Sequence, residues 1–173
     1  MVRIETVTGR ADRRRRGLLV SQLRATNTQA SPVMRALRDT PDGRETPLQV
    51  WALAEDGANA QDGTDRADDK PAGPDDRADE ALVAGLDART WGRWLHIDLL
   101  WVDARHRRAG LGARLLATAE QIAREERGCR HARVCTWDFQ APDFYQRYGY
   151  AVVCAIPDYP PGATEYTLTK RLD

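Results

Sequence analysis

The sequence predicts an α/β protein in which a mixed sheet carries helices on both of its faces. Two observations lead to this expectation: strand-like segments dominate early in the chain, and a strand–helix–strand unit follows them. The length of 173 residues is sufficient for one well-buried core and favours a single domain over residues 1–173. No internal repeat is visible. We therefore expect one layered domain.

The N-terminal part is expected to place two helices between two strands. Residues 3–7 alternate apolar and polar side chains, as a strand does, and lack the long apolar run of a signal peptide. Helices are expected at residues 11–24 and 31–38, and Pro32 suits the first helical position of the second. A strand is expected at residues 48–54.

Residues 55–80 differ in composition from the rest of the chain. They contain ten acidic and three basic side chains and no large apolar residue. Such a segment cannot bury enough surface to offset the entropy lost on ordering, so we interpret it as a disordered, solvated acidic insert between two strands. The chain as a whole balances 26 basic against 26 acidic residues, so the remainder is net positive. A positive body suits an anionic coenzyme and would also suit nucleic acid.

The C-terminal part is expected to consist of strands that flank two helices. Strands at residues 81–86 and 94–102 are expected to be joined by a turn near residues 87–92. The next helix repeats apolar residues at three-to-four spacing, and Gly128 suits the position just past its end. This helix is expected at residues 110–126. It is followed by a strand at 131–137, a helix at 142–148 and strands at 150–155 and 164–170.

The junction between the strand at 94–102 and the helix at 110–126 has the features of an anion-binding turn. Its sequence is Arg107-Arg108-Ala109-Gly110-Leu111-Gly112. Unpaired backbone N–H groups and the helix dipole attract an anion there, and two glycines without Cβ let a phosphate reach the main chain. The dinucleotide fingerprint would need a glycine where Leu115 stands, and the other common phosphate loop would need Gly-Lys-Ser/Thr. The pattern that remains is Arg-x-x-Gly-x-Gly.

This pattern, together with a second motif, resembles the GNAT superfamily of acetyl-coenzyme A-dependent N-acetyltransferases, in a bacterial branch. The second motif, residues 139–150, reads Phe-Gln-Ala-Pro-Asp-Phe-Tyr-Gln-Arg-Tyr-Gly-Tyr and looks like the family's short helix ending in Phe-Tyr-x-x-x-Gly-aromatic. The resemblance extends over residues 82–172 and more loosely over the N-terminal half. It implies a GNAT-like single domain of the α/β (α+β) class, with a central, mostly antiparallel twisted sheet of six to seven strands and about four helices. It also implies a V-shaped splay between strands 94–102 and 131–137.

The resemblance implies acetyl-coenzyme A (acetyl-CoA) as cosubstrate. Its pantetheine arm would lie in the splay, paired with the backbone of Leu100, Trp101 and Val102, and an amide near Leu99 or Leu100 would donate to the thioester oxygen. Gln140 is the candidate to replace an asparagine that many relatives use for the pantetheine amides. Further expected coenzyme contacts are Arg107, Arg108, Ala109, Gly110, Leu111, Gly112, Ala113, Phe144 and Tyr145.

Acetyl transfer to an amine requires a neutral amine, a polarised carbonyl and a stabilised leaving thiolate. Tyr145 is the candidate group to hydrogen-bond or protonate the thiolate, because a phenol with an ordinary pKa of about 10 is protonated at neutral pH. Alternatively, Tyr145 is an ordinary aromatic residue that packs the helix. His96 and Asp98 are the candidate bases, because strand alternation would place them with Leu100 on one face, toward the substrate. Either could instead be a hydrogen-bonded structural residue.

The composition and spacing exclude other classes of site. The three cysteines, 129, 135 and 154, lack metal or redox spacing and are expected to be reduced thiols in the core, and the histidines are too scattered for a metal site. No run approaches transmembrane length, so a cytoplasmic protein is expected. The expected partner is a small-molecule or peptide amine, with a homodimer possible. Two alternatives stay open: a coenzyme-binding sensor without turnover, and nucleic-acid binding by residues 13–16, which we interpret rather as the solvated start of a helix.

Overall fold

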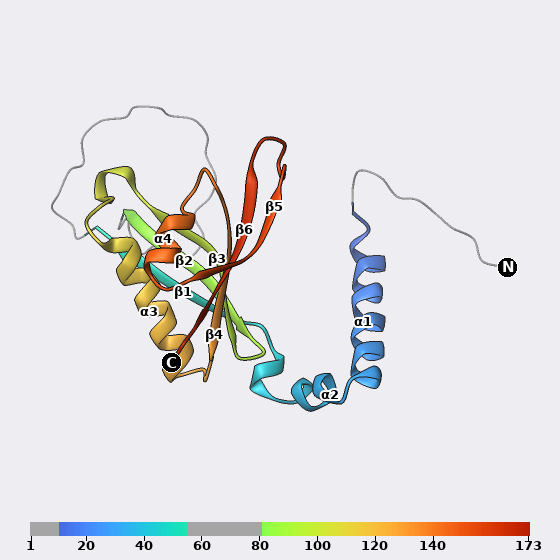
Figure 1. The fold of residues 1–173 in the computed structure, drawn as a ribbon. Helices are drawn as coiled ribbons and strands as arrows, with labels where there is room; N and C mark the ends of the chain where they lie inside the picture. Colours follow the sequence, from blue (N-terminus) through green and yellow to red (C-terminus); the bar gives the residue numbers. More distant parts are fainter. Residues whose placement is uncertain (1–10, 55–80) are drawn as a thin grey trace, which may run out of the picture. The chain divides into compact units, whose positions relative to one another are not determined.

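The structure, a computed structural model, describes residues 11–54 and 81–173, which Figure 1 shows in colour. The chain divides into two compact units, Met1–Arg44 and Glu45–Asp173. The expected first strand and the acidic insert lie outside the described residues. The organisation of the whole chain as one domain stays a prediction.

The described part of the first unit is helical. Its elements are α1 (Arg13–Ala30), α2 (Pro32–Arg38) and a short 3-10 turn (Pro41–Gly43). Asp12 caps α1 by accepting the N–H of Arg15 at 2.9 Å. The helix continues to Ala30 and does not end at residue 24 as expected, because no glycine or proline lies between residue 24 and Pro32. The basic run at residues 13–16 forms its exposed first turn.

The second unit is built on one six-stranded sheet with the order β1-β2-β3-β4-β6-β5. Its strands are β1 (Thr46–Leu53), β2 (Leu82–Trp91), β3 (Trp94–Val102), β4 (His131–Trp137), β5 (Ala151–Pro157) and β6 (Thr164–Arg171). All neighbouring pairs are antiparallel except β3 and β4, which are parallel. The predicted mixed, mostly antiparallel sheet is therefore confirmed.

Strand β2 is longer than the sequence indicated. A turn was expected near residues 87–92, but β2 continues to Trp91 and pairs along its length with both β1 and β3. The chain reverses at Gly92 and Arg93, whose φ angles are 60° and 64°. Two consecutive positive φ values are what a tight hairpin turn requires, so the reversal takes only these two residues.

Strands β3 and β4 separate part of the way along their length, as the resemblance implied (Figure 1). Their parallel ladder runs from Trp94 opposite His131 to Ile97 opposite Val134 and stops there. Beyond this point β3 pairs only with β2, and β4 only with β6. The two strands therefore open a V whose inner edges are unpaired within the described residues.

A β-bulge lies where the V opens. Asp87 pairs with Leu99 and Ala88 with Ile97, so Asp98 has no partner on β2. One extra residue reverses the alternation of the strand. Leu100 therefore packs on the same core as Ile97, and not on the face of His96 and Asp98. The expectation that these three residues share a face is wrong for Leu100.

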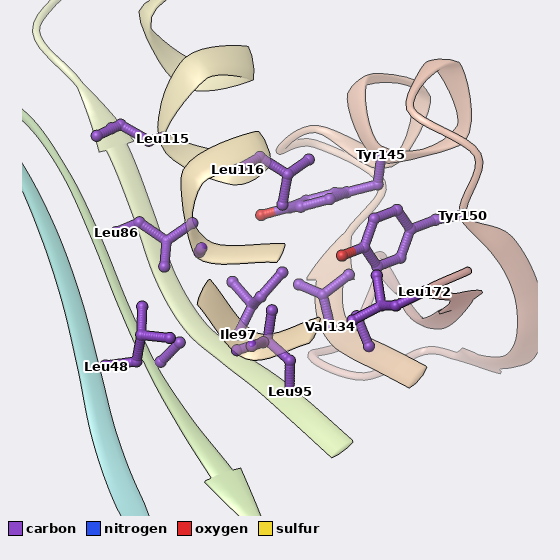
Figure 2. Packing of buried hydrophobic residues seen from close by; sticks show 14 of the residues in the cluster. Leu48, Leu86, Leu95, Ile97, Leu115, Leu116, Val134, Tyr145, Tyr150 and Leu172 are labelled. Atoms are coloured by element: carbon purple, nitrogen blue, oxygen red, sulfur yellow. The ribbon is translucent and has the colours of Figure 1, made fainter. Parts of the chain in front are cut away.

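The core lies between the sheet and two helices, α3 (Leu111–Glu125) and α4 (Pro142–Arg147), which share one face. Helix α3 packs on β1, β2 and β3, and Figure 2 shows Leu116 of α3 and Tyr145 of α4 above the sheet residues Ile97 and Val134. Helices α1 and α2 belong to the other unit, so helices on both faces stay a prediction. Within residues 11–54 and 81–173, no helix is long and apolar enough to span a membrane.

Candidate active site

The glycine turn connects β3 to α3 and presents the open start of a helix. Arg108 and Gly110 adopt positive φ angles of 63° and 79°, which bend the chain into the helix. The first bond of the helix runs from the Arg114 N–H to the Gly110 carbonyl at 3.0 Å. The amides of the three preceding residues, 111–113, consequently have no partner inside the helix. Such amides at a helix N-terminus are suited to a phosphate.

Gly112 lies where three elements of the site meet. A Cβ added there would be 3.5 Å from Phe144 of α4 and 3.6 Å from Val102 of β3. The expected coenzyme contacts on the turn, on α4 and at the end of β3 are therefore neighbours in space. Gly112 itself adds no side chain to this space.

The arginines of the turn differ in their bonding. Arg107 donates through Nε to the Val102 carbonyl at 3.0 Å and so ties the turn to the end of β3. Arg105 bonds Asp103, and this hydrogen bond is the main reason that the pKa of Asp103 falls to about 2. Arg108 is exposed and makes no ion pair with any residue that the structure describes. Its guanidinium is the one of these three without a partner in the turn.

A hollow of about 160 Å³ lies at the point where the β3–β4 ladder ends, on the sheet face opposite α3. Cross-strand register brings Arg89 of β2 and Arg133 of β4 to either side of His96. The full lining is Arg89, His96, Ile97, Asp98, Arg133, Val134 and Cys135. Sequence reasoning found His96 and Asp98 but missed both arginines, because only the strand register makes them neighbours.

His96 is held as a neutral imidazole. Burial lowers its pKa, and the positive charges of Arg89 and Arg133 lower it further. The nearby Trp91 backbone acts in the opposite direction and raises the pKa, and Nε2 is enclosed and has no hydrogen-bond partner among the described residues. In the neutral ring with the proton on Nδ1, Nε2 has an unused lone pair.

Asp98, the other candidate base, is engaged in an ion pair. Its carboxylate accepts a short hydrogen bond from the Arg89 guanidinium, and this bond raises the pKa of Arg89. Arg89 also lies 3.9 Å from Glu45. Asp98 thus balances charge next to His96, on the same face.

Tyr145 is buried, with only 6% of its surface exposed. Its ring packs edge-on against Phe144 and Tyr150, at centroid distances of 5.2 and 5.6 Å, and extends toward Leu116 (Figure 2). Burial raises the pKa of Tyr145 to about 12, so the phenol stays protonated. Its hydroxyl bonds no residue that the structure describes. These contacts support the packing interpretation of Tyr145, and its role toward the thiolate stays a prediction.

Gln140 and the last residues of β3 lie at the border of the V. The side-chain oxygen of Gln140 accepts from the Thr136 hydroxyl at 3.1 Å and from the Trp137 N–H at 3.4 Å, which leaves its NH₂ group for other partners. Leu100 and Val102 pack against the core, whereas Trp101 is exposed on the opposite face. Their backbone, more than their side chains, forms the edge of the V.

The three cysteines form no disulfide, and Cys129 is buried whereas Cys135 and Cys154 are exposed. The expectation that all three are core residues is wrong for two of them. Cys135 is on the face of His96, and Cys154 is on the last strand of the sheet. Within the described ranges, no three His, Cys, Asp or Glu side chains are grouped as metal ligands would be.

Comparison with known proteins finds one family over most of the chain. The sequence model of the acetyltransferase (GNAT) family matches residues 33–150. Blasticidin-S acetyltransferase from Streptomyces morookaense is 45% identical over 155 residues, which cover 90% of this chain and 99% of that protein. An acetyltransferase from Agrobacterium fabrum is 34% identical over 93 residues, or 54% of this chain and 67% of that protein.

Solved structures show the same fold. A Bacillus cereus acetyltransferase superposes with a TM-score of 0.71 at 23% identity, over 96% of this chain and 98% of the other. An Agrobacterium tumefaciens structure gives 0.69 at 22% identity, over 98% and 99%.

Proposed function

Since this chain belongs to the GNAT family of acetyltransferases and takes its acetyl group from acetyl-CoA, we propose that it acetylates a primary amine of a small molecule, with blasticidin S as the acceptor. The observation that carries the choice of acceptor is the 45% identity, which extends over 99% of a blasticidin-S acetyltransferase. We place the reaction in the cytoplasm of a bacterium, where three free thiols are stable.

The described residues fit the coenzyme. The unpaired amides at residues 111–113 and the exposed Arg108 would hold its pyrophosphate, and Gly112 keeps their approach open. The inner edge of β3 beyond Ile97 would pair with the pantetheine, because no described strand occupies that edge. When bound, acetyl-CoA supplies an activated acetyl thioester.

The bulge at Asp98 gives the backbone a role in polarising the thioester carbonyl. It rotates the peptide units that follow, at Leu99 and Leu100, relative to the regular strand before it. An amide there donates toward the carbonyl oxygen as negative charge develops on it. Such a donor contributes about 3 kcal/mol when it is oriented in advance.

His96 is the proton acceptor in this proposal. As the amine nitrogen bonds the acetyl carbon, its proton passes to Nε2, the nitrogen without a partner. Asp98 holds the Arg89 guanidinium beside the imidazole, and its negative charge offsets the positive charge that His96 gains with the proton.

Tyr145 hydrogen-bonds the departing thiolate and protonates it, and the phenolate then regains a proton from solvent. Its raised pKa keeps the hydroxyl protonated across the physiological range, and no described group competes for that proton. The contacts with Phe144 and Tyr150 fix the ring without engaging the hydroxyl. Acid and base thus come from opposite sides of the V, Tyr145 from the α4 face and His96 from the other.

A thiol-release assay with acetyl-CoA tests this function across a panel of amines. The panel contains blasticidin S, an aminoglycoside, a polyamine, free amino acids and a peptide with a free N-terminus. We expect thiol release with blasticidin S, matched by an acetylated product in the mass spectrum. Turnover with the peptide alone would overturn the small-molecule acceptor. Coenzyme binding without turnover on any amine would overturn acetyl transfer itself.

A further inference from the structure

The hollow beside His96 holds more positive than negative charge. Its lining includes two arginines, Arg89 and Arg133, and one carboxylate, Asp98. Asp98 pairs with Arg89, and Glu45 lies 3.9 Å from the same guanidinium. Arg133 makes no ion pair with any residue that the structure describes. One positive charge in the hollow is therefore left without a counter-charge in the described part of the chain.

The Arg133 guanidinium extends toward the opening of the V. Its Nη2 lies 3.6 Å from Cys135 Sγ, two residues further along β4. Val134, between them, is the last residue of β4 that pairs with β3, so Cys135 already lies beyond the ladder. His96 stands opposite Arg133 in the register and lines the same hollow. The guanidinium and the imidazole therefore border one space, which the proposed function assigns to the acceptor amine.

The sulfur contact is weak, so Arg133 can exchange it for a stronger acceptor. A thiol sulfur accepts hydrogen bonds poorly, and Cys135 also lies 3.5 Å from the Thr167 hydroxyl, a partner that it keeps without the arginine. A carboxylate is a stronger acceptor, because the planar guanidinium donates two parallel N–H bonds to its two oxygens. The free charge of Arg133 is therefore suited to a carboxylate on a ligand.

The charge and the size of the hollow favour a carboxylate over a phosphate. Because Asp98 already holds Arg89, the hollow offers one positive charge, which matches a carboxylate, whereas a phosphate ester carries up to about two negative charges. The volume of about 160 Å³ admits a small polar group. Pockets that enclose a whole drug-sized molecule measure about 300–1,000 Å³, so the rest of the acceptor extends outside the hollow.

We propose that Arg133 determines the specificity of acetyl transfer by binding a carboxylate of the acceptor and so placing its amine beside His96. The acceptor class is then an amine that carries a carboxylate in the same molecule. This inference rests on the proposed function and names the group of the acceptor that the site recognises. Arg133 thus contacts the substrate in addition to acting on the charge of His96.

The first test compares blasticidin S with its methyl ester, which keeps the amines but has no carboxylate. We expect the wild-type enzyme to acetylate both, with KM for the ester at least about tenfold higher, the loss expected for one hydrogen bond between charged groups. Equal KM values would overturn the inference and leave acetyl transfer intact. If another amine of the panel reacts instead, an acceptor without a carboxylate overturns the inference. If no amine reacts, the proposed function falls and this inference falls with it.

Variants of Arg133 show whether this arginine is the group that recognises the carboxylate. Arg133→Gln should raise KM for blasticidin S at least about tenfold and leave KM for the ester within about twofold of wild type, since the ester has no charge to lose. Arg133→Lys keeps the charge without the planar fork and should give an intermediate value. Arg171→Gln, on the neighbouring strand β6, is the matched control and should resemble wild type with both compounds.

Two conditions separate recognition of the acceptor from other effects of Arg133. The KM values are measured above the acid limb of the pH profile, where His96 is neutral in every variant. The dissociation constant of acetyl-CoA and the unfolding temperature should stay at wild-type values, which excludes misfolding. A folded Arg133→Gln enzyme whose KM rises equally for both compounds, or for neither, overturns the carboxylate contact.

Discussion

The charge state of His96 is set by its neighbours on adjacent strands. Arg89 and Arg133 flank the imidazole through strand register, and burial acts in the same direction, so the neutral form is favoured at physiological pH. A neutral imidazole can accept a proton, and its unpartnered Nε2 is the atom that would do so. Asp98 is less suited to this role because Arg89 already holds its carboxylate.

Arg133→Gln is expected to move the acid limb of the pH–rate profile to higher pH. Activity falls as pH drops through the pKa of His96, because the protonated ring cannot accept the amine's proton. Arg133 lowers that pKa, so removing its charge raises it and the loss of rate begins at a higher pH. The measurement is kcat against pH at saturating substrates. Arg171→Gln, beside Asp173, is the control and should leave the limb in place.

Tyr145→Phe is expected to lower kcat by about 100-fold, the lower range for loss of a general acid. The ring contacts with Phe144 and Tyr150 are kept, so the dissociation constant of acetyl-CoA and the unfolding temperature should stay near wild-type values. Tyr148→Phe, on an exposed side chain of the same segment, is the control. An unchanged kcat in Tyr145→Phe would make Tyr145 a packing residue only.

At the scale of elements, local and non-local structure differed in how well they could be predicted. The glycine turn and α4 follow from short contiguous motifs, and both were expected where the structure has them. The bulge at Asp98 depends on the pairing of β2 with β3, so sequence alternation alone placed Leu100 on the wrong face. The length of β2 was also predicted wrongly, because it too depends on strand pairing. Asp87 and Arg89 are polar and suggest a turn in the sequence, but in the sheet they lie on the face opposite the core.

Two substitutions of different size test the turn. Gly112→Trp is expected to weaken acetyl-CoA binding by at least about 100-fold, or about 2.7 kcal/mol, because the indole would fill the helix start. Gly112→Ala should bind within about threefold of wild type, since its Cβ would make ordinary contacts at 3.5 and 3.6 Å. Calorimetric titration measures both. Tight binding by a folded Gly112→Trp would show that the coenzyme lies elsewhere.

A second prediction at this scale concerns the attachment of α3 to the C-terminal strands. Glu120 of α3 accepts from the Tyr150 hydroxyl at 2.9 Å and from Lys170 of β6 at 2.6 Å. Glu120→Ala removes both bonds and is expected to lower the free energy of unfolding by about 1–3 kcal/mol. Urea denaturation measures it. Glu126→Ala, at an exposed residue just after α3, should change stability by less than about 0.5 kcal/mol.

At the scale of the whole molecule, the sequence predicted the family, the mixed sheet and the V. It could not predict the hollow around His96, because Arg89, His96 and Arg133 come from three strands whose register is fixed only by folding. It also misplaced two cysteines: Cys135 lies on the face of the central strand β4 opposite the core, and Cys154 lies on the edge strand β5, where all residues are exposed. The acidic insert and the first strand stay predictions.

The most direct test of the central claim, that an amine takes the acetyl group straight from the coenzyme at the V, is initial-rate kinetics with both substrates varied. Double-reciprocal plots for acetyl-CoA and blasticidin S should give intersecting lines, and the enzyme incubated with acetyl-CoA alone should gain no mass. Parallel lines with an acetylated Cys135, or no acetylated antibiotic at any concentration, would contradict the account.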